Sequence, residues 1–315
     1  MSNNRLYKLY QEHKFAASKW FELQKIIRRL KLMYYLFQRP VYSYLLSKTT
    51  SFKDIKQSYN IDRILLNDGG TFKEYIYGIC NSRHQIRNSV ILVPGCGYGQ
   101  HLITLANFKP RLIVACDLYE YPEEWKYVQS VIKEKGTKII FLKGGIENSI
   151  IHDMAPFDWV ITDAVLEHVN GLNPFLKECH TLLKNDGWFY AGFGPIWYGA
   201  GGDHIDWGDE GIFNHLLCEG DYDERLLNLD SSNEVDSTEG VFMVKNKLFS
   251  YLRAKEYLDA LEKYGFLKEI LWVKFAMPAW GYLKKHPDKE ILLLQKGSTL
   301  FDLYSKGLII WAKKI

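Results

Sequence analysis

A short apolar run followed by alternating glycines constrains the fold of this chain more than any other segment. The run, Val90–Pro94, is too short for most helices and predicts a buried parallel strand. Glycines let the backbone turn tightly against a ligand, and three of them follow the run (Gly95, Gly97 and Gly99). A second apolar run, 112–116, leads to Asp117. Asp117 comes 22 residues after Gly95 in the sequence. This is close to the spacing at which a carboxylate holds a ribose hydroxyl in nucleotide-binding α/β sheets.

The spacing of the glycines indicates which kind of nucleotide fits. Dinucleotide sites use G-x-G-x-x-G because a pyrophosphate needs a helix N-terminus and close helix packing. Here Gly99 follows Gly97 by only two residues, whereas the third glycine of that fingerprint would follow by three. The pattern therefore disfavours a pyrophosphate. An apolar strand running into G-x-G-x-G, with an acid at the end of the second strand, resembles the class I S-adenosylmethionine (SAM)-dependent methyltransferases.

Two further landmarks extend the resemblance over roughly residues 85 to 195. Residues 157–169, FDWVITDAVLEHV, are similar to the family's fourth strand and the turn after it. Residues 182–188, LLKNDGW, take the place of the turn before strand five. The resemblance implies a Rossmann-like α/β fold, with a seven-stranded, mostly parallel sheet whose last strand is antiparallel. It also implies SAM as the cofactor.

The cofactor residues are carried over from the family motifs position by position. Two positions depart from the family: Val93 stands where an acid often lies near the SAM amino group, and Gly145 where an acid often lies near the adenine. Glu147 or backbone groups are the expected substitutes. Asp117 is the expected ribose ligand, and Leu118 could flank the adenine. The full set of expected cofactor-binding residues is Gly95, Cys96, Gly97, Gly99, Asp117, Leu118, Ile146, Glu147 and Asp163.

Apolar periodicity predicts the elements around these motifs. The alternation of strands and helices from residue 90 onward is typical of a parallel sheet covered on both faces. We expect strands at 90–94, 112–116, 138–142, 157–162, 187–193, 266–275 and 307–314, and helices within 4–47 and 52–68 and at 71–87, 99–107, 122–135, 172–184 and 254–264.

The predicted domain organisation follows from these elements. Residues 1–70 form an N-terminal helical cap, and residues 71–315 form the methyltransferase domain. The segment 195–250 is rich in Gly, Asp and Asn and is expected to be an insertion after strand five. The sequence shows no internal repeat. With 315 residues, 47% of them hydrophobic, the chain is long enough for one α/β core plus these additions.

Composition favours a soluble, cytoplasmic protein. No apolar run approaches the roughly 18 residues of a membrane span. Charged residues interrupt positions 1–20, where a signal peptide would be apolar. The five cysteines are odd in number and contain no C-x-x-C pair, so neither a disulfide framework nor a zinc ribbon is expected.

Charge is distributed unevenly along the chain. Residues 1–50 hold ten Lys or Arg and two Glu, whereas residues 201–240 hold twelve Asp or Glu and one Arg. Aromatic residues interleave with the N-terminal basic ones, a composition that also suits an interfacial helix or a nucleic-acid arm. We favour a basic N-terminal cap that faces the acidic segment 201–240, which we call the lid. Peripheral contact of residues 1–50 with an anionic membrane or glycolipid stays open, and nucleic acid is the least favoured partner.

The segment after strand five carries the candidate catalytic residues. Methyl transfer is an in-line displacement, so the protein must align the acceptor and, for a hydroxyl acceptor, remove a proton. His204 lies between two carboxylates, the composition of a base with its orienting partner. We expect His204 to be the general base, oriented by Asp203 or Asp206. His168 is the alternative, although a Glu-His pair at that place usually looks structural.

The same region offers two secondary roles. Asp163, Asp203, His204 and Asp206 together could bind a divalent cation, but acidic lids are common without one, and we predict no metal. Aromatic side chains after strand five could stack on sugar rings, with core packing as the ordinary alternative: Trp197, Tyr198 and Trp207.

The expected acceptor is a hydroxyl group. Strand four lacks the Asn-Pro-Pro-Tyr type of motif that holds an amino nitrogen, so exocyclic-nitrogen acceptors are disfavoured. A lid of glycine and tryptophan beside a histidine suits O-methylation of a sugar, glycan intermediate or other small molecule. The alternatives are a lipid-linked or quinone-like acceptor, an RNA or protein acceptor, and a non-catalytic regulatory protein that binds SAM. Oligomeric state is not indicated.

Overall fold

The computed structural model describes residues 86–205, 207–208, 210–218, 222, 224, 226 and 235–315. The expected N-terminal cap, 1–70, lies outside these residues, as do the helices expected within 4–47 and 52–68 and nearly all of 71–87. Among the described residues, no helix is long and apolar enough to cross a membrane.

The described residues form one seven-stranded sheet of order β3-β2-β1-β4-β5-β7-β6. Its last strand, β7, pairs antiparallel with both β5 and β6, and the other pairs are parallel. This is the class I methyltransferase fold expected from the sequence. The strands are β1 (Val90–Pro94), β2 (Leu112–Asp117), β3 (Lys138–Lys143), β4 (Phe157–Asp163), β5 (Leu183–Phe193), β6 (Phe266–Phe275) and β7 (Ser305–Lys314).

Burial of both faces explains why β1 is apolar throughout. All five of its residues are buried. Leu92 packs into the core on one face of the sheet, and Ile91 and Val93 pack into the core on the other. The strand order reverses between β1 and β4, and open α/β sheets bind ligands beside such a reversal, beyond the carboxyl ends of the strands. The glycines that follow β1 therefore lie where a ligand is expected.

Helices cover the sheet close to the expected positions. They are α5 (Gln100–Leu105), α6 (Pro122–Glu134), α8 (Leu172–Leu182) and α12 (Ala254–Lys263), with one 3₁₀ turn, η1 (Ala106–Phe108), after α5 and another, η2 (Leu166–His168), after β4. One helix, α7 (Ser149–Met154), was not predicted from the sequence. This helix has six residues, too few to show an apolar period, and begins where the Asn148 side chain accepts a hydrogen bond of 3.0 Å from the Ile150 amide.

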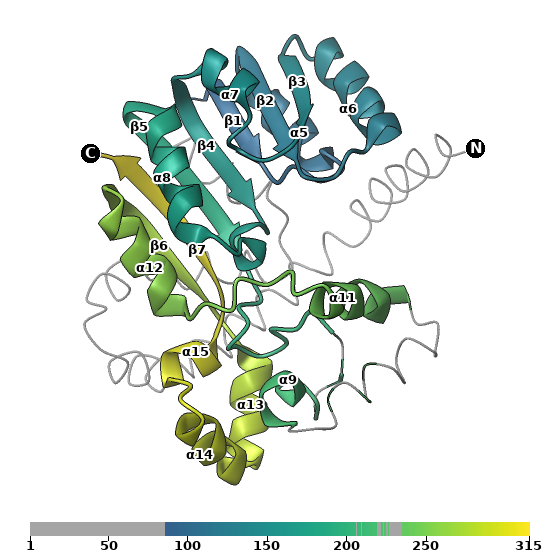
Figure 1. Cartoon of the computed structure of the whole chain (residues 1–315), viewed down its shortest axis with the longest axis vertical. Coiled ribbons are helices and arrows are strands. Elements are labelled where there is room, and N and C mark those ends of the chain that lie inside the picture. Colours follow the sequence, from purple (N-terminus) through teal and green to yellow (C-terminus); the bar gives the residue numbers. More distant parts are fainter. Residues whose placement is uncertain are drawn as a thin grey trace, which may run out of the picture.

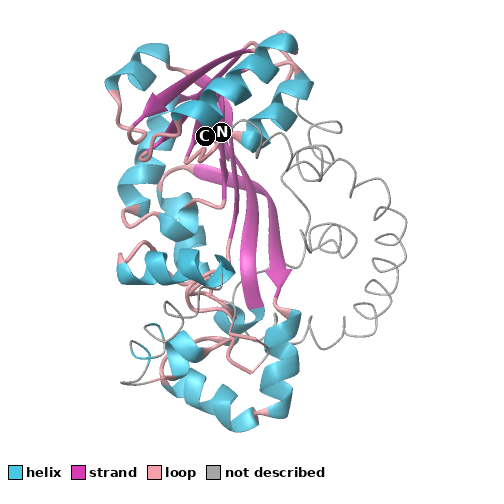
Figure 2. Ribbon diagram, turned by 90° about the vertical axis from the view of Figure 1, so that its right-hand side faces the viewer, coloured by secondary structure: helices cyan, strands magenta, loops and turns pink. Residues whose placement is uncertain are grey.

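A second insertion, between β6 and β7, was also not predicted from the sequence. It contains α13 (Met277–Lys285), α14 (Pro287–Gln295) and α15 (Leu300–Tyr304). In Figure 1 these helices lie beside α9 (Asn214–Leu217) and near α11 (Val235–Lys245), beyond the end of β4. Lys296 donates to the Leu216 carbonyl at 3.0 Å, which joins the segment after α14 to α9. Helix α9 of the first insertion and α13–α15 of the second thus form one helical layer, and Figure 2 shows helices gathered at one end of the sheet.

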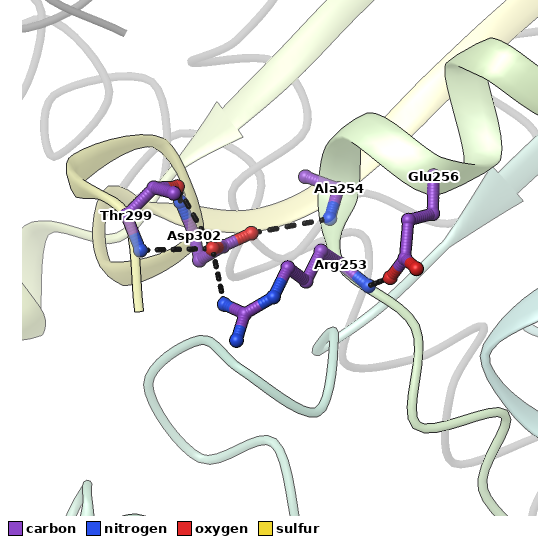
Figure 3. Close-up of polar contacts among 5 residues, drawn as sticks. All are labelled: Arg253, Ala254, Glu256, Thr299 and Asp302. Carbon is purple, nitrogen blue, oxygen red and sulfur yellow. Dashed lines mark hydrogen bonds and ion pairs between the residues drawn. The ribbon is translucent and has the colours of Figure 1, made fainter. Parts of the chain in front are cut away.

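A buried carboxylate joins this layer to the main domain. Asp302 in α15 is 2% exposed and accepts hydrogen bonds from the Thr299 amide at 2.9 Å and the Thr299 hydroxyl at 2.8 Å (Figure 3). It also accepts from the Arg253 guanidinium at 2.9 Å and the Ala254 amide at 3.3 Å. The guanidinium lies 4.1 Å from the ring centre of Tyr198, in the loop after β5. Asp302 thereby ties α15 to the start of α12 and to that loop.

Candidate active site

The glycine loop after β1 takes a left-handed backbone that other residues rarely adopt. Gly95, Gly97 and Gly99 have φ angles of 69°, 51° and 78°. At two of them the space is also closed. A methyl group added at Gly95 would lie 2.5 Å from the Val165 side chain, and one added at Gly99 would lie 3.0 Å from Phe141. The loop is therefore a cradle that only glycine can build at these points.

Asp117, at the end of β2, is hydrogen-bonded to this loop. Its Oδ2 accepts from the Gly97 amide at 2.8 Å, and its Oδ1 accepts from the Tyr119 amide at 3.0 Å. The Trp125 indole donates to the Gly97 carbonyl at 2.8 Å, so both backbone polar groups of Gly97 are bonded. The structure thus brings together the glycines and the acid that the sequence paired. A narrow glycine cradle beside a carboxylate fits a nucleoside-bearing cofactor.

The two departures from the family pattern have visible consequences. Val93 is buried among apolar side chains, so no acid from this position reaches the cofactor side. Beyond β3, the Glu147 carboxylate folds back over Gly145. It lies so close that a methyl group added at Gly145 would overlap it. This carboxylate therefore lies beside the position where the family often has its acid, and its role near the adenine stays a prediction.

The remaining expected cofactor residues differ in accessibility. Leu118 is 69% exposed, next to Asp117, whereas Ile146 is buried in the core. Cys96 is buried within the loop, and burial, with the nearby Asp117 charge, raises the pKa of its thiol well above the ordinary value. Cys96 is thus a neutral, space-filling side chain. Asp163 is half-buried at the end of β4.

The turns after β4 and β5 are bonded to each other. The Ala164 amide donates to the Gly192 carbonyl at 2.7 Å. Three residues further on, the buried Glu167 carboxylate accepts from the Gly194 amide at 2.8 Å through Oε1. Val165 lies between these two bonds in the sequence and contacts Gly95. The β4 and β5 turns are therefore fastened together directly beside the glycine loop.

His204 lies in this region with its ring orientation set by the backbone. Its Nε2 is 3.1 Å from the Pro195 carbonyl, and its own φ is 60°. Burial is the main cause that lowers the pKa of His204 to about 4, so the imidazole is neutral near pH 7. Because a carbonyl only accepts hydrogen bonds, Nε2 carries the proton and Nδ1 carries the lone pair.

Asp203, one of the two expected orienting partners of His204, is not the group that bonds to its Nε2. Asp203 is 0% exposed and accepts from the Trp207 indole at 2.7 Å and the Tyr222 hydroxyl at 2.8 Å. Its hydrogen bonds hold the lid together, and the Pro195 carbonyl, not a carboxylate, bonds to the Nε2–H of His204. Asp206 lies outside the described residues.

His168 lies against His204, which the sequence did not indicate. The two ring centres are 5.0 Å apart, and Nδ1 of His168 is 2.8 Å from the Leu248 carbonyl. Ligand atoms of Glu167, His168 and His204 lie within 4.8 Å of one another. The only sequence signal was the Glu-His pair after strand four. Its 36-residue distance from His204 concealed the cluster, because β5 and its turn intervene.

The aromatic residues after β5 pack mainly on other protein side chains. Trp197 contacts the rings of Phe249 and Tyr251, with ring centres 5.0 and 4.6 Å away. Tyr198 lies under the Arg253 guanidinium, and the Trp207 indole is bonded to Asp203. These contacts favour the packing role that the sequence left open over stacking on a sugar.

A hollow of about 470 Å³ lies elsewhere, at the amino-terminal ends of the central strands. It includes Ser89 before β1, Asp158 in β4 and Lys184 in β5. The glycine loop and Asp117 follow the carboxyl ends of their strands, so this hollow is at the opposite edge of the sheet. It belongs to neither the cofactor cradle nor the histidine cluster.

Comparison with known families agrees with this geometry. Residues 92–191 match the family described as "Methyltransferase domain". This range begins in β1, contains the glycine loop and Asp117, and ends in β5. The chain thus carries a SAM-dependent methyltransferase domain, and SAM is its cofactor. No curated protein sequence matches the chain.

Solved structures of similar fold include enzymes of different reactions. An S-adenosylmethionine-dependent methyltransferase from Mesorhizobium loti is 15% identical, with 78% of this chain and 99% of that chain covered and a TM-score of 0.46. Geranyl diphosphate C-methyltransferase from Streptomyces coelicolor A3(2) is 10% identical, with 77% of each chain covered and a TM-score of 0.46. The [4+2]-cyclase SpnF is 12% identical, with 77% and 80% covered and a TM-score of 0.44. Likeness at this level does not identify the reaction.

Proposed function

We propose that this chain transfers the methyl group of SAM to a hydroxyl group of a sugar, a glycan intermediate or another small molecule. The observation that carries this proposal is the contact between His168 and His204 beside the cofactor cradle. Val165 contacts the glycine loop, and Glu167 and His168 follow it within three residues. His168 in turn contacts His204. A proton-accepting nitrogen near the cofactor suits a hydroxyl acceptor, which must lose its proton during transfer.

The chain's own residues would divide this task between a cofactor side and an acceptor side. The glycine cradle and Asp117 hold the cofactor, with the Asp117 carboxylate beside the Gly97 amide as the proposed ribose contact. Bound SAM supplies an electrophilic methyl group. On the acceptor side, Nδ1 of His204 takes the hydroxyl proton, while the Pro195 carbonyl fixes the opposite nitrogen. Alignment and proton removal are the two contributions the protein can make to such a displacement.

Other acceptors remain outcomes of the same experiments. The basic segment 1–50, outside the described residues, leaves contact with an anionic membrane or glycolipid as an alternative, which would place the hydroxyl on a lipid-linked or quinone-like acceptor. RNA and protein acceptors are less favoured. A regulatory SAM-binding protein without transfer activity is the alternative of a different class.

The cofactor part of the proposal predicts that binding depends on Asp117. Calorimetric titration of SAM into the full chain should show saturable binding, and Asp117→Ala should weaken it at least about tenfold because the carboxylate holds both the loop and the ligand. Asp259→Ala, at an exposed ion pair in α12, is the matched control and should bind as the unchanged chain does. Absence of binding at millimolar SAM would contradict the proposal.

The acceptor part requires a transfer assay. Radiolabelled methyl transfer from SAM should be screened against nucleotide sugars, free sugars, small phenols, prenylated quinols in vesicles, RNA and denatured protein. We expect label in the carbohydrate or small-molecule group. With an acceptor in hand, His204→Ala should reduce turnover about 10² to 10⁴-fold, whereas His152→Ala, at a partly exposed helix end, should not. Full turnover by His204→Ala would exclude the base.

A further inference from the structure

Three side chains after β4 and β5 offer donor atoms to a common point. The ligand atoms of Glu167, His168 and His204 lie within 4.8 Å of one another. Donors around one tetrahedral cation at 2.0–2.2 Å are about 3.4 Å apart, so modest side-chain adjustment would bring all three onto one ion. We propose that Glu167, His168 and His204 form a binding site for a divalent cation of the zinc, iron or cobalt type.

The backbone orients each of the three side chains in the way metal ligands are commonly oriented. Nδ1 of His168 is bonded to the Leu248 carbonyl, and Nε2 of His204 to the Pro195 carbonyl. Oε1 of Glu167 accepts from the Gly194 amide. A histidine that donates one ring N–H to a carbonyl keeps its lone pair on the other nitrogen, which is the tautomer a cation requires. The site is therefore supported by a second layer of backbone contacts.

The type of donor selects the type of cation. Two imidazoles and one carboxylate suit zinc, iron(II) and cobalt(II), whereas magnesium and calcium prefer an all-oxygen set. Three protein ligands also leave at least one coordination position for a substrate, as in catalytic rather than structural sites. Phe249 lies against both histidines, with ring centres at 5.3 and 5.1 Å, and provides an apolar wall.

The conformation of His204 is a further observation consistent with this role. Its φ of 60° is in the left-handed region, which a residue with a side chain occupies at a cost. This backbone points the segment after Gly202 so that the ring meets His168, while Asp203, one residue earlier, stays in the lid network. The adjacent residues thus serve different structures.

This inference rests on the proposed function only for the position of the acceptor. In the metal-loaded protein, Nδ1 of His204 would be a ligand and not a base. The cation would act as a Lewis acid that lowers the pKa of the acceptor hydroxyl, and the proton would pass to solvent water.

The test measures metal binding directly and does not depend on activity. The full chain is treated with EDTA, desalted and titrated with Zn²⁺ by calorimetry, and in parallel with Co²⁺ by visible absorption. We expect one site that is lost or weakened at least about tenfold in Glu167→Gln, His168→Gln and His204→Gln. The d–d bands of bound Co²⁺ should weaken in the same variants. His286→Gln, at an exposed ion pair with Glu210, should leave both readouts unchanged.

Two outcomes would overturn the inference. One is no binding of Zn²⁺ or Co²⁺ by the unchanged chain, and the other is binding by His168→Gln and His204→Gln that is as tight as that of the unchanged chain. Circular dichroism melts of each variant separate loss of the site from loss of folding. SAM titration of the same EDTA-treated samples separates the two proposals, because the cofactor cradle contains none of the three ligands. A chain that binds SAM but binds neither Zn²⁺ nor Co²⁺ would refute the cation site and retain the methyltransferase proposal.

Discussion

Gly95 shows how one residue can carry two requirements at once. Its φ of 69° disfavours any side chain, and the space where a Cβ would lie is occupied by Val165. The first requirement concerns the backbone of the loop, and the second concerns the distance between the β1 and β4 turns. The sequence indicates the first, because glycines at alternate positions are a turn signal. The second depends on a contact between residues 70 positions apart.

The two requirements can be separated by mutation. Gly136 has a similar φ of 79° but no atom within 4 Å of the added methyl group, so Gly136→Ala should destabilise the chain by only about 1 kcal/mol. Gly95→Ala should cost more, about 2–4 kcal/mol, because it adds overlap with Val165. Urea unfolding curves of the two variants give both changes in the free energy of unfolding.

A double mutant tests the cause. Val165→Ala in the Gly95→Ala background should recover part of the lost stability, beyond the sum of the single effects. Equal costs for Gly95→Ala and Gly136→Ala would show that Val165 yields freely and that the contact does not hold the two turns together.

At the scale of elements, the parallel strands were predictable and the short helices were not. The five parallel strands from β1 to β5 are runs of apolar residues with buried faces, and four of them were expected within one residue of their bounds. The exception, β5, begins at Leu183, four residues before the expected start, because the expected helix 172–184 ends at Leu182. The helices α13, α14 and α15 are stabilised by contacts with residues far along the chain, which leaves a weaker local pattern.

Asp302 predicts how strongly the second insertion is attached. Removing its carboxylate would leave the Thr299 and Ala254 amides and the Arg253 guanidinium without their acceptor (Figure 3). Asp302→Ala should therefore lower the free energy of unfolding by about 3 kcal/mol. Asp259→Ala, which breaks an exposed i,i+4 pair with Lys255, should change it by less than about 0.5 kcal/mol. Similar unfolding midpoints for the two variants would show that Asp302 does not join the two parts.

At the scale of the whole molecule, contacts through the loop after β5 join the two insertions and the sheet. The loop after β5 carries His204, and Tyr198 in the same loop is held by Arg253, which is bonded to Asp302 in the other insertion. The proposed acceptor side is therefore supported by segments from three separate parts of the sequence. The cofactor side is built almost entirely from the continuous segment that matches the methyltransferase family.

Cofactor binding should accordingly stabilise the whole chain. A ligand present at 100 times its dissociation constant adds about 2.7 kcal/mol to the stability of the state that binds it. For a chain of this size, the melting temperature should rise by several degrees in saturating SAM. Asp117→Ala, with an affinity at least about tenfold lower, should reduce the added stability to about 1.4 kcal/mol or less and so cut the rise by about half or more at the same SAM concentration. An equal rise in the variant would mean that the stabilising ligand binds elsewhere.

The sequence by itself determined the cofactor half of this protein. The apolar strand, the glycines and Asp117 lie within 28 residues, and their local spacing is sufficient to define a strand, a turn and an acid at the next strand end. Tertiary structure decided the histidine cluster, which we propose as the acceptor half. Glu167 and His168 meet His204 only because β5 runs parallel to β4 and returns its following loop to the same edge of the sheet. Local spacing carries no information about such a contact, since it arises from strand order and packing.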